Sequence, residues 1–209
     1  MTINKGHVLL RLARQAMQEA LAGVATAAHT AERISDAAWL RAPGATFVTL
    51  MQRGELRGCI GTLLAHRPLR ADVQENAVAA ALRDPRFPPM VAAELAHTDI
   101  EVSLLSTMQP LHAASEADAL VQLRPGIDGL FLESGVCRAT FLPQVWEQLP
   151  EPRDFMAHLK DKAGLARAFW GPDVRLKRYT VDKWRETSID RGEISIGHDA
   201  SSHAEGAGS

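Results

Sequence analysis

The run LRGCIGTL, residues 56–63, constrains the fold of this chain more than any other stretch. An apolar run at residues 46–51 precedes it, and a short polar turn that contains a glycine separates the two. Two apolar runs joined by such a turn predict a β-hairpin. Because side chains alternate across a strand, Arg57, Cys59 and Gly61 are expected on one face of the hairpin.

That arrangement would have chemical consequences, because a cation close to a thiol favours the nucleophilic thiolate form. Cys59 is therefore a candidate nucleophile, and Arg57 is a candidate to activate it or to hold an anion. Free cysteines more often act as small buried apolar groups, so a structural role for Cys59 is the alternative. Gly58 and Gly61 weaken a strand, and such glycines mark a bulge or the close approach of a ligand or another backbone.

A second unusual stretch is RDPRFPP, residues 83–89, which follows a predicted helix over residues 68–83. Its three prolines exclude helix and central strand, so a rigid extended loop is expected. We predict that Phe87 is buried against the lobe that carries the hairpin and that Arg86 pairs with a carboxylate. Asp84 is a turn former or an acid–base group. Arg86 either anchors the loop or faces an anion in a cleft.

The other titratable residues give weaker signals. Glu101 opens a predicted strand over residues 99–105, and His66 is the candidate base nearest to Cys59 in the sequence. The histidines and cysteines lack the spacing of a metal site, so no metal is predicted. No Walker loop, dinucleotide fingerprint or nucleophile elbow occurs, and no cofactor is predicted.

The composition excludes several classes of partner. The 209 residues are 46% hydrophobic and 23% charged, which is typical of a globular protein with a real core. The net charge of −2 gives no basic footprint, so neither nucleic acid nor an anionic membrane is expected to bind. Two cysteines and no transmembrane or secretory segment favour a cytoplasmic location. The basic stripe at residues 175–179 is interpreted as an edge strand.

Periodicity indicates the remaining elements. Predicted helices cover residues 8–21, 115–123, 143–149 and 152–163, with strands over 129–133, 136–142 and 174–184. Helices interleaved with hairpins predict an α+β fold with a mixed or largely antiparallel sheet flanked by helices. Residues 187–209 are expected to form a flexible tail.

Several blocks together resemble the AMMECR-type domain family. They are LRGCIGTL and RDPRFPP, then EVSLLS (101–106), PGIDGL (125–130) and ATFLPQVW (139–146). Their order is similar to that of the bacterial form, protein A of the AmmeMemoRadiSam system, from Gly6 to Trp184. The resemblance implies a single domain over residues 1–186 with two unequal lobes. The larger lobe would contain both termini, and the cysteine strand would face a cleft between the lobes.

The family has no settled reaction, so the function rests on the motif. The leading hypothesis is that the cleft binds a small molecule or a modified residue, with Cys59 as nucleophile and His66 as base if there is catalysis. The expected binding residues are Arg57, Gly58, Gly61, Asp84, Arg86 and Glu101. The alternative, implied by the resemblance, is a non-catalytic component that acts with a Memo-type, dioxygenase-like protein and a radical SAM protein. Whether the protein is an enzyme stays open.

Overall fold

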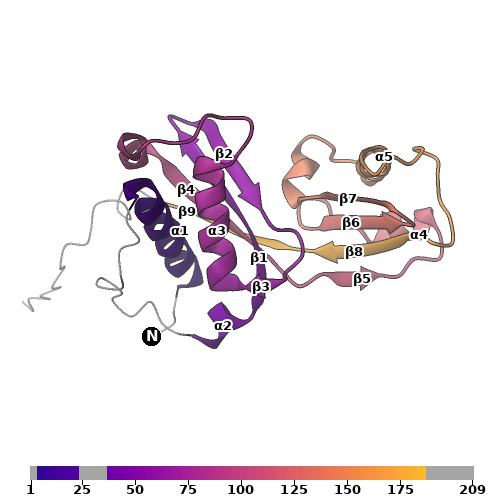
Figure 1. Cartoon of the computed structure of the whole chain (residues 1–209). Coiled ribbons are helices and arrows are strands. Elements are labelled where there is room, and N and C mark those ends of the chain that lie inside the picture. Colours follow the sequence, from indigo (N-terminus) through magenta and orange to yellow (C-terminus); the bar gives the residue numbers. More distant parts are fainter. Residues whose placement is uncertain (1–3, 24–36, 187–209) are drawn as a thin grey trace, which may run out of the picture.

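The protein consists of two lobes, each built on its own antiparallel sheet (Figure 1). The computed structural model describes residues 4–23 and 37–186. Lobe 1 contains the strands β1 (Pro43–Gln52), β2 (Glu55–Gly61), β3 (Arg67–Pro68), β4 (Asp99–Leu105) and β9 (Val181–Arg185). Lobe 2 contains β5 (Gln109–Leu111), β6 (Gly129–Ser134), β7 (Cys137–Phe141) and β8 (Arg175–Tyr179). The predicted α+β fold with antiparallel sheets and helices is confirmed.

In lobe 1 the strand order is β2-β1-β4-β9, and β3 pairs with β1. The helices α1 (Lys5–Ala22) and α3 (Leu69–Leu82) pack on one face of this sheet, and α2 (Ala38–Arg41) and η1 (Ala92–His97) complete the lobe (Figure 1). The side chains on the covered face include Val48, Leu50, Ile100 and Val102, which are fully buried. Alternate residues of the same strands form the opposite face, which turns toward lobe 2.

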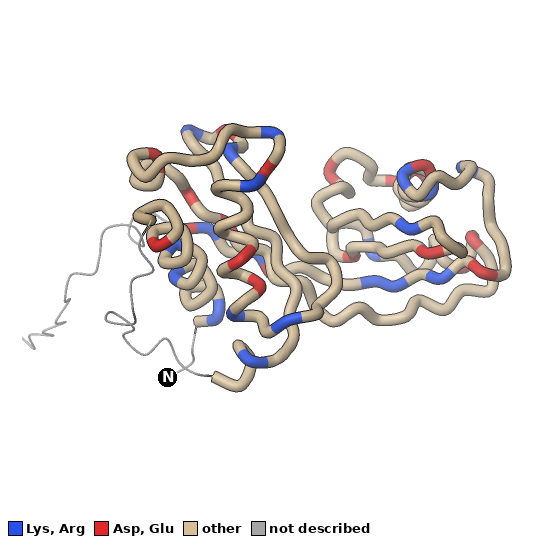
Figure 2. Tube along the Cα trace, in the orientation of Figure 1, with Lys and Arg blue, Asp and Glu red and all other residues tan. Residues whose placement is uncertain are grey.

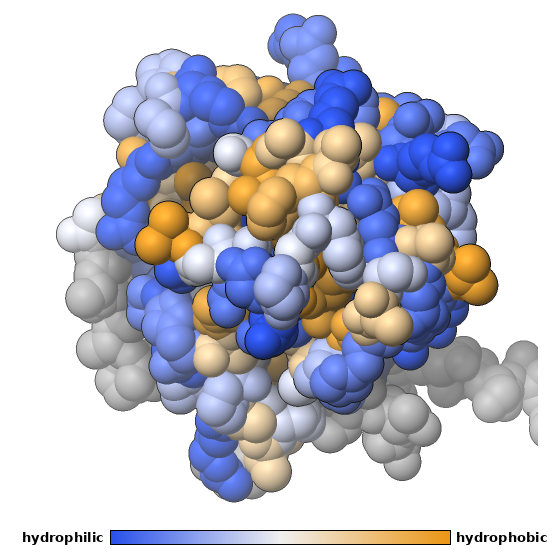
Figure 3. Space-filling model, turned by 90° about the vertical axis from the view of Figure 1, so that its right-hand side faces the viewer, coloured by the Kyte–Doolittle hydropathy of each residue, from blue (hydrophilic) through white to orange (hydrophobic). Residues whose placement is uncertain are grey.

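In lobe 2 the strand order is β5-β8-β6-β7. Its core lies beneath α4 (Glu116–Gln122), η2 (Pro143–Glu147) and α5 (Pro152–Lys162). The Trp146 and Phe155 rings stack there with centroids 3.8 Å apart. Seen from the end of lobe 2, apolar groups alternate with hydrophilic ones on the surface (Figure 3). Positively and negatively charged residues are interspersed along the described chain (Figure 2).

The β1–β2 hairpin was predicted and is confirmed. Its turn residues Arg53 and Gly54 both have positive φ, at 52° and 84°, as tight hairpin turns require. The helix α1 ends at Ala22, and Gly23, with a φ of 65°, forms its left-handed C-terminal cap. Among the described residues, no helix is long and apolar enough to cross a membrane. The predicted flexible tail, 187–209, lies outside the described residues.

The predicted single strand over residues 174–184 is wrong, because the chain leaves one sheet for the other at Thr180. β8 pairs with β5 and β6 in lobe 2, whereas β9 pairs with β4 in lobe 1. Ser106 faces Thr180 at this crossing, and the two residues exchange hydrogen bonds of 2.9 Å. The lobes are thus joined by two adjacent antiparallel connections. Because β8 lies inside its sheet, the basic stripe is not an edge strand either.

A small apolar cluster packs around this junction. Tyr179 is buried there with Ala45 and Leu105. The Tyr179 hydroxyl lies 2.8 Å from Thr140 Oγ1 and donates to the carbonyl of Phe141 over 3.1 Å. Burial raises the pKa of Tyr179 to about 12, because an ionised phenolate would lose its hydration.

This residue gives a direct spectroscopic prediction, because Tyr179 is the only tyrosine of the chain. The tyrosinate absorbance should rise with a midpoint near pH 12, where the ordinary tyrosine midpoint is about 10. Since the folded pKa is the higher one, this contribution to stability is complete below about pH 10 and is lost as the pH approaches 12. A midpoint near 10 while the near-ultraviolet circular dichroism is still native would contradict the burial.

Candidate functional site

The predicted face shared by Arg57 and Cys59 is interrupted by a β-bulge. Leu50 pairs with Gly58 while its neighbour Met51 pairs with Leu56, so Arg57 has no partner across the hairpin. An extra residue of this kind breaks the alternation of side chains along a strand. Arg57 and Cys59 consequently have separate sets of contacts.

The Arg57 guanidinium donates hydrogen bonds to the end of the proline loop and to the segment that follows it. Its Nε donates to Glu94 Oε1 over 2.9 Å, and its Nη2 donates to Glu94 Oε2 and to the Pro88 carbonyl. The hydrogen bond from Arg57 is the main reason that the pKa of Glu94 falls to about 2. The Arg57 Nη1 atom is buried and has no hydrogen-bond partner among residues 4–23 and 37–186. Arg57 therefore ties the hairpin to η1.

Cys59 is contacted by Asp84 and Arg86, at the start of the proline loop. Its amide donates to Asp84 Oδ2 over 2.8 Å, and its carbonyl accepts from Arg86 Nη2 over 3.2 Å. Its half-buried sulfur lies 3.3 Å from the Thr49 hydroxyl. β2 is an edge strand, and Asp84 and Arg86 satisfy its outward backbone groups at Cys59 as a neighbouring strand would. The two motifs therefore form one unit, the edge cap, which consists of Cys59, Asp84 and Arg86.

The edge cap is held together by a strong ion pair. Arg86 Nη2 lies 2.7 Å from the buried Asp84 carboxylate, which confirms the predicted carboxylate partner of Arg86. Asp84 also accepts from the Arg86 backbone amide over 3.1 Å, the bond of a turn former. The Arg86 guanidinium holds the pKa of Asp84 well below its usual range. The guanidinium that contacts Cys59 is therefore that of Arg86, through the Cys59 carbonyl.

The prediction that Phe87 is buried is wrong. Phe87 is only half-buried, and the Arg86 guanidinium lies 5.5 Å from the centre of its ring. The loop is anchored by Met90, which is 3% exposed and packs in the lobe 1 core. Its amide donates to the carbonyl of Ala81 at the end of α3. The prediction placed the larger apolar side chain, Phe87, in the core. The loop instead directs the smaller side chain of Met90 into the core.

Alanine substitutions should therefore rank in the opposite order to the sequence prediction. Met90→Ala should lower the free energy of unfolding by about 2–5 kcal/mol, as for other buried methionines. Phe87→Ala should cost about 1 kcal/mol, since a half-buried ring loses less contact area. Urea denaturation of both variants measures the difference. A larger loss for Phe87→Ala than for Met90→Ala would contradict this account of the loop.

The two motif glycines are explained by contacts within the protein. A Cβ at Gly58 would lie 2.2 Å from the backbone oxygen of Ala80, because α3 crosses closely over β2. A Cβ at Gly61 would lie 2.2 Å from the Phe47 ring on the neighbouring strand. Both glycines mark a close approach, as expected, and the approaching groups belong to this chain.

Glu101 lies on the sheet face that turns toward lobe 2. The pairing places Cys59, Thr49 and Glu101 in one row across β2, β1 and β4. Glu101 forms a partly exposed ion pair of 3.2 Å with Lys183 of β9. His66 is exposed in the loop before β3, and its ring Nδ1 lies 3.0 Å from the carbonyl oxygen of Leu64. Glu101 therefore shares a face with Cys59, whereas His66 makes no recorded contact with the thiol.

A cavity of about 370 Å³ lies between the lobes, and this same sheet face of lobe 1 forms part of its wall. Lobe 1 contributes Ser103, Val181 and Lys183, and lobe 2 contributes Pro125, Gly126, Leu142, Pro143, Gln144, Trp146, Glu147 and Pro150. No residue of the LRGCIGTL run is among these lining residues. The cavity is next to the row that holds Cys59, one step further along β4, since Ser103 follows Glu101 on the same face.

Sequence reasoning missed the polar lining of this inter-lobe cavity. The side chains of Ser103, Gln144 and Glu147 form no hydrogen bond with any other described residue, although Ser103 is only 7% exposed. Ser103 and Gln144 lie within the EVSLLS and ATFLPQVW blocks, so a signal was present. Nothing in the sequence showed that residues 41 positions apart would face one cavity.

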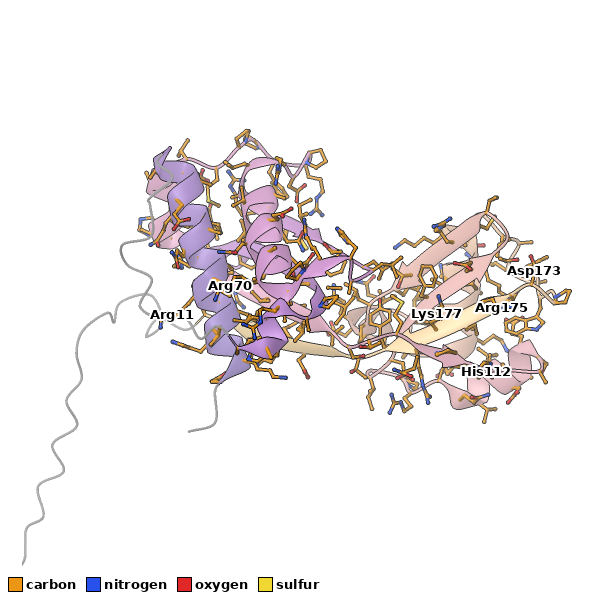
Figure 4. All side chains as sticks on the ribbon, turned by 60° about the horizontal axis from the view of Figure 1, so that its bottom comes forward. Arg11, Arg70, His112, Asp173, Arg175 and Lys177 are labelled. Atoms are coloured by element: carbon orange, nitrogen blue, oxygen red, sulfur yellow. The ribbon has the colours of Figure 1, made fainter. Side chains whose placement is uncertain are left out.

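Other charged side chains that could belong to a functional site form contacts within the protein. Asp128 is buried and accepts from Arg124, its partner at 2.6 Å. Arg175 and Lys177 project from the open face of the lobe 2 sheet, and Arg175 donates to backbone carbonyls (Figure 4). Within residues 4–23 and 37–186, no group of three or more histidine, cysteine or acidic side chains is arranged to hold a metal ion.

Comparison with known proteins places this architecture in a family. Residues 10–184 match the AMMECR1 family model. A protein of Methanothermobacter thermautotrophicus is 36% identical over 185 residues, which are 88% of this chain and 95% of that protein. A Thermotoga maritima protein is 36% identical over 156 residues, covering 74% of this chain and 84% of its own length. The crystal structure of an uncharacterized protein from Pyrococcus horikoshii superposes with a TM-score of 0.72 at 30% identity, over 87% of this chain and 91% of that one. The chain belongs to the AMMECR1 family.

Proposed function

We propose that this AMMECR1 protein binds a small molecule, or a modified side chain of another protein, in the inter-lobe cavity. The observation that carries the proposal is the lining of the cavity, where the Ser103 hydroxyl, the Gln144 amide and the Glu147 carboxylate have no hydrogen-bond partner among the described residues. Polar groups that are open to a cavity and form no hydrogen bond within the protein are free to bind a ligand that enters it. A mostly apolar lining with a few free polar groups is typical of ligand sites of this size.

A fragment screen by ligand-observed NMR tests the proposal. Several fragments should bind the wild-type protein, and Ser103→Leu, which fills the cavity, should abolish their signals. Thr49→Leu is the matched control, because Thr49 lies on the same sheet face but does not line the cavity. If no fragment binds, or if the hits persist in Ser103→Leu, the cavity is not the site.

Thiol chemistry at Cys59 is a second candidate, and the position of Arg86 favours it. Arg86 is about half exposed and donates to the Cys59 carbonyl over 3.2 Å, so a cation lies at the residue that carries the thiol. Cys59 would then be the nucleophile for a ligand that binds at the edge cap. Alkylation by iodoacetamide in a Cys137→Ser background should be faster than for a free thiol and slower in Arg86→Gln. Equal rates in all three cases would remove this candidate.

The alternative is a non-catalytic component that acts with Memo-type and radical SAM proteins, as in the AmmeMemoRadiSam system. Exposed apolar side chains support this alternative. Leu56 and Val91 are 39% and 60% exposed, and both lie near the Arg57–Glu94 pair. Co-purification with these two proteins should survive Cys59→Ser and be lost in a Leu56→Asp, Val91→Asp double variant. Retention by the double variant would argue against this surface.

A further inference from the structure

Two opposite charges face the inter-lobe cavity from different lobes. Lys183 is on β9 of lobe 1, and Glu147 is the last residue of η2 in lobe 2. The structure records no ion pair between them. The Glu147 carboxylate has no partner among the described residues, and the ammonium of Lys183 is 3.2 Å from Glu101. A cation site and an anion site are therefore available in one cavity.

The Lys183–Glu101 pair does not prevent Lys183 from binding a ligand. The side chains of Lys183 and Glu101 are 45% and 21% exposed, and ion pairs at this level of exposure contribute little free energy. A lysine side chain has a flexible four-carbon stem, so its ammonium can contact a second anion without leaving the first. Glu147 is exposed, so an ammonium group has only to displace water from its carboxylate and breaks no hydrogen bond within the described part of the chain.

The surface between these charges is uncharged. Leu142, Val181 and the Trp146 ring form its apolar part, and the Ser103 hydroxyl and Gln144 amide supply neutral donors and acceptors. The Trp146 ring is fixed, because its indole nitrogen donates to the Asp128 carbonyl over 2.7 Å. A ligand that matches this pattern has a short apolar body with an anionic group at one side and a cationic group at the other.

We propose that the ligand of the inter-lobe cavity is a zwitterion of the amino-acid class. This inference rests on the proposed function and adds the chemical class of the ligand. The ligand carboxylate pairs with Lys183, its ammonium pairs with Glu147, and its apolar body lies against Leu142 and Trp146. Because the two charged partners belong to different lobes, such a ligand bridges the lobes, whereas a ligand with one charge engages only one of them.

The test uses isothermal titration calorimetry at low salt to compare two six-carbon zwitterions with the compounds left when one charged group is removed. The zwitterions are L-norleucine and 6-aminohexanoate, which differ in the spacing of their charges. Pentylamine and hexanoate each keep only one of the two charges. At least one zwitterion should bind about tenfold more tightly than both single-charge compounds, since each charged hydrogen bond contributes on the order of a factor of ten.

Charge variants of the protein show which residue binds each charged group of the ligand. Lys183→Met should reduce the affinity for the zwitterion to that of pentylamine, and Glu147→Gln should reduce it to that of hexanoate. Glu147→Lys should instead raise the affinity for hexanoate. Both side chains are largely exposed, so the variants should fold, and thermal denaturation verifies this. Glu55→Gln and Lys177→Met remove the same charges far from the cavity and should change nothing.

The outcomes separate the two proposals. If single-charge compounds bind as tightly as both zwitterions, or if Glu147→Lys leaves hexanoate binding unchanged, the zwitterion inference is wrong while cavity binding by screened fragments still stands. If these compounds and the fragment screen give no binding at all, the proposed function itself fails.

Discussion

Replacing Asp84 by alanine is expected to lower the free energy of unfolding by about 3 kcal/mol. The buried carboxylate accepts from the Cys59 amide and pairs with Arg86, so its removal leaves the edge of β2 without its cap. Arg86 is half exposed and can be rehydrated, which keeps the loss at the lower end for a broken buried pair. Urea denaturation at neutral pH measures the change. Asp154→Ala, an exposed carboxylate in the first turn of α5, should cost less than about 1 kcal/mol.

The same pair predicts how stability depends on pH. The folded pKa of Asp84 is lowered, chiefly by Arg86, so the contribution of Asp84 is fully present above the unfolded pKa of about 4. It is lost as the pH falls below that value. The difference in unfolding free energy between wild type and Asp84→Asn should therefore be constant from neutral pH to about 5 and should narrow below about 4. A difference that stays constant down to pH 3 would show that Asp84 does not carry this charge in the fold.

Gly58→Ala is the second substitution expected to have a large effect. Its Cβ would lie 2.2 Å from the Ala80 carbonyl oxygen, and neither group can rotate away because both belong to the backbone framework. Separating α3 from β2 disturbs the lobe 1 core, so the free energy of unfolding should fall by about 3 kcal/mol or more. Thermal or urea denaturation gives the measurement.

Gly61→Ala provides the matched comparison for Gly58. The same strand and the same added methyl group are involved, but the obstructing group is the Phe47 ring, which can shift as a side chain. Its cost should be about 1 kcal/mol, at the lower end for an added methyl group in a packed site. Similar losses for the two variants would show that the α3–β2 contact is not the reason for glycine at position 58.

Local signals in the sequence were sufficient for much of the fold. The period of apolar residues in α1 and its terminal Gly23, and the turn glycine of the β1–β2 hairpin, each depend on neighbouring residues only. The division between β8 and β9 at Thr180 could not be predicted in this way. The alternation of side chains continues across the crossing, and only the pairing partners of the two segments differ.

The candidate site was predictable only in part, for a related reason. The LRGCIGTL and RDPRFPP runs were recognised separately, but their union through Asp84 and Arg86 depends on how α3 returns the chain to β2. The bulge at Arg57 removes the alternation on which its expected contact with Cys59 rested. The inter-lobe cavity depends on the placement of η2 against β4 and β9, which no single segment encodes.

The adjacent connections at Ser106 and Thr180 make lobe 2 a removable module. The chain leaves lobe 1 at the end of β4 and returns at the start of β9, two strands that are already paired as neighbours. A tight hairpin turn such as Asn-Gly could therefore replace residues 106–180 without changing the register of the remaining sheet. Lobe 2 could likewise be inserted into another protein. Because β5 and β8 lie side by side, the start of β5 and the end of β8 could be joined to the two strands of a hairpin in that protein.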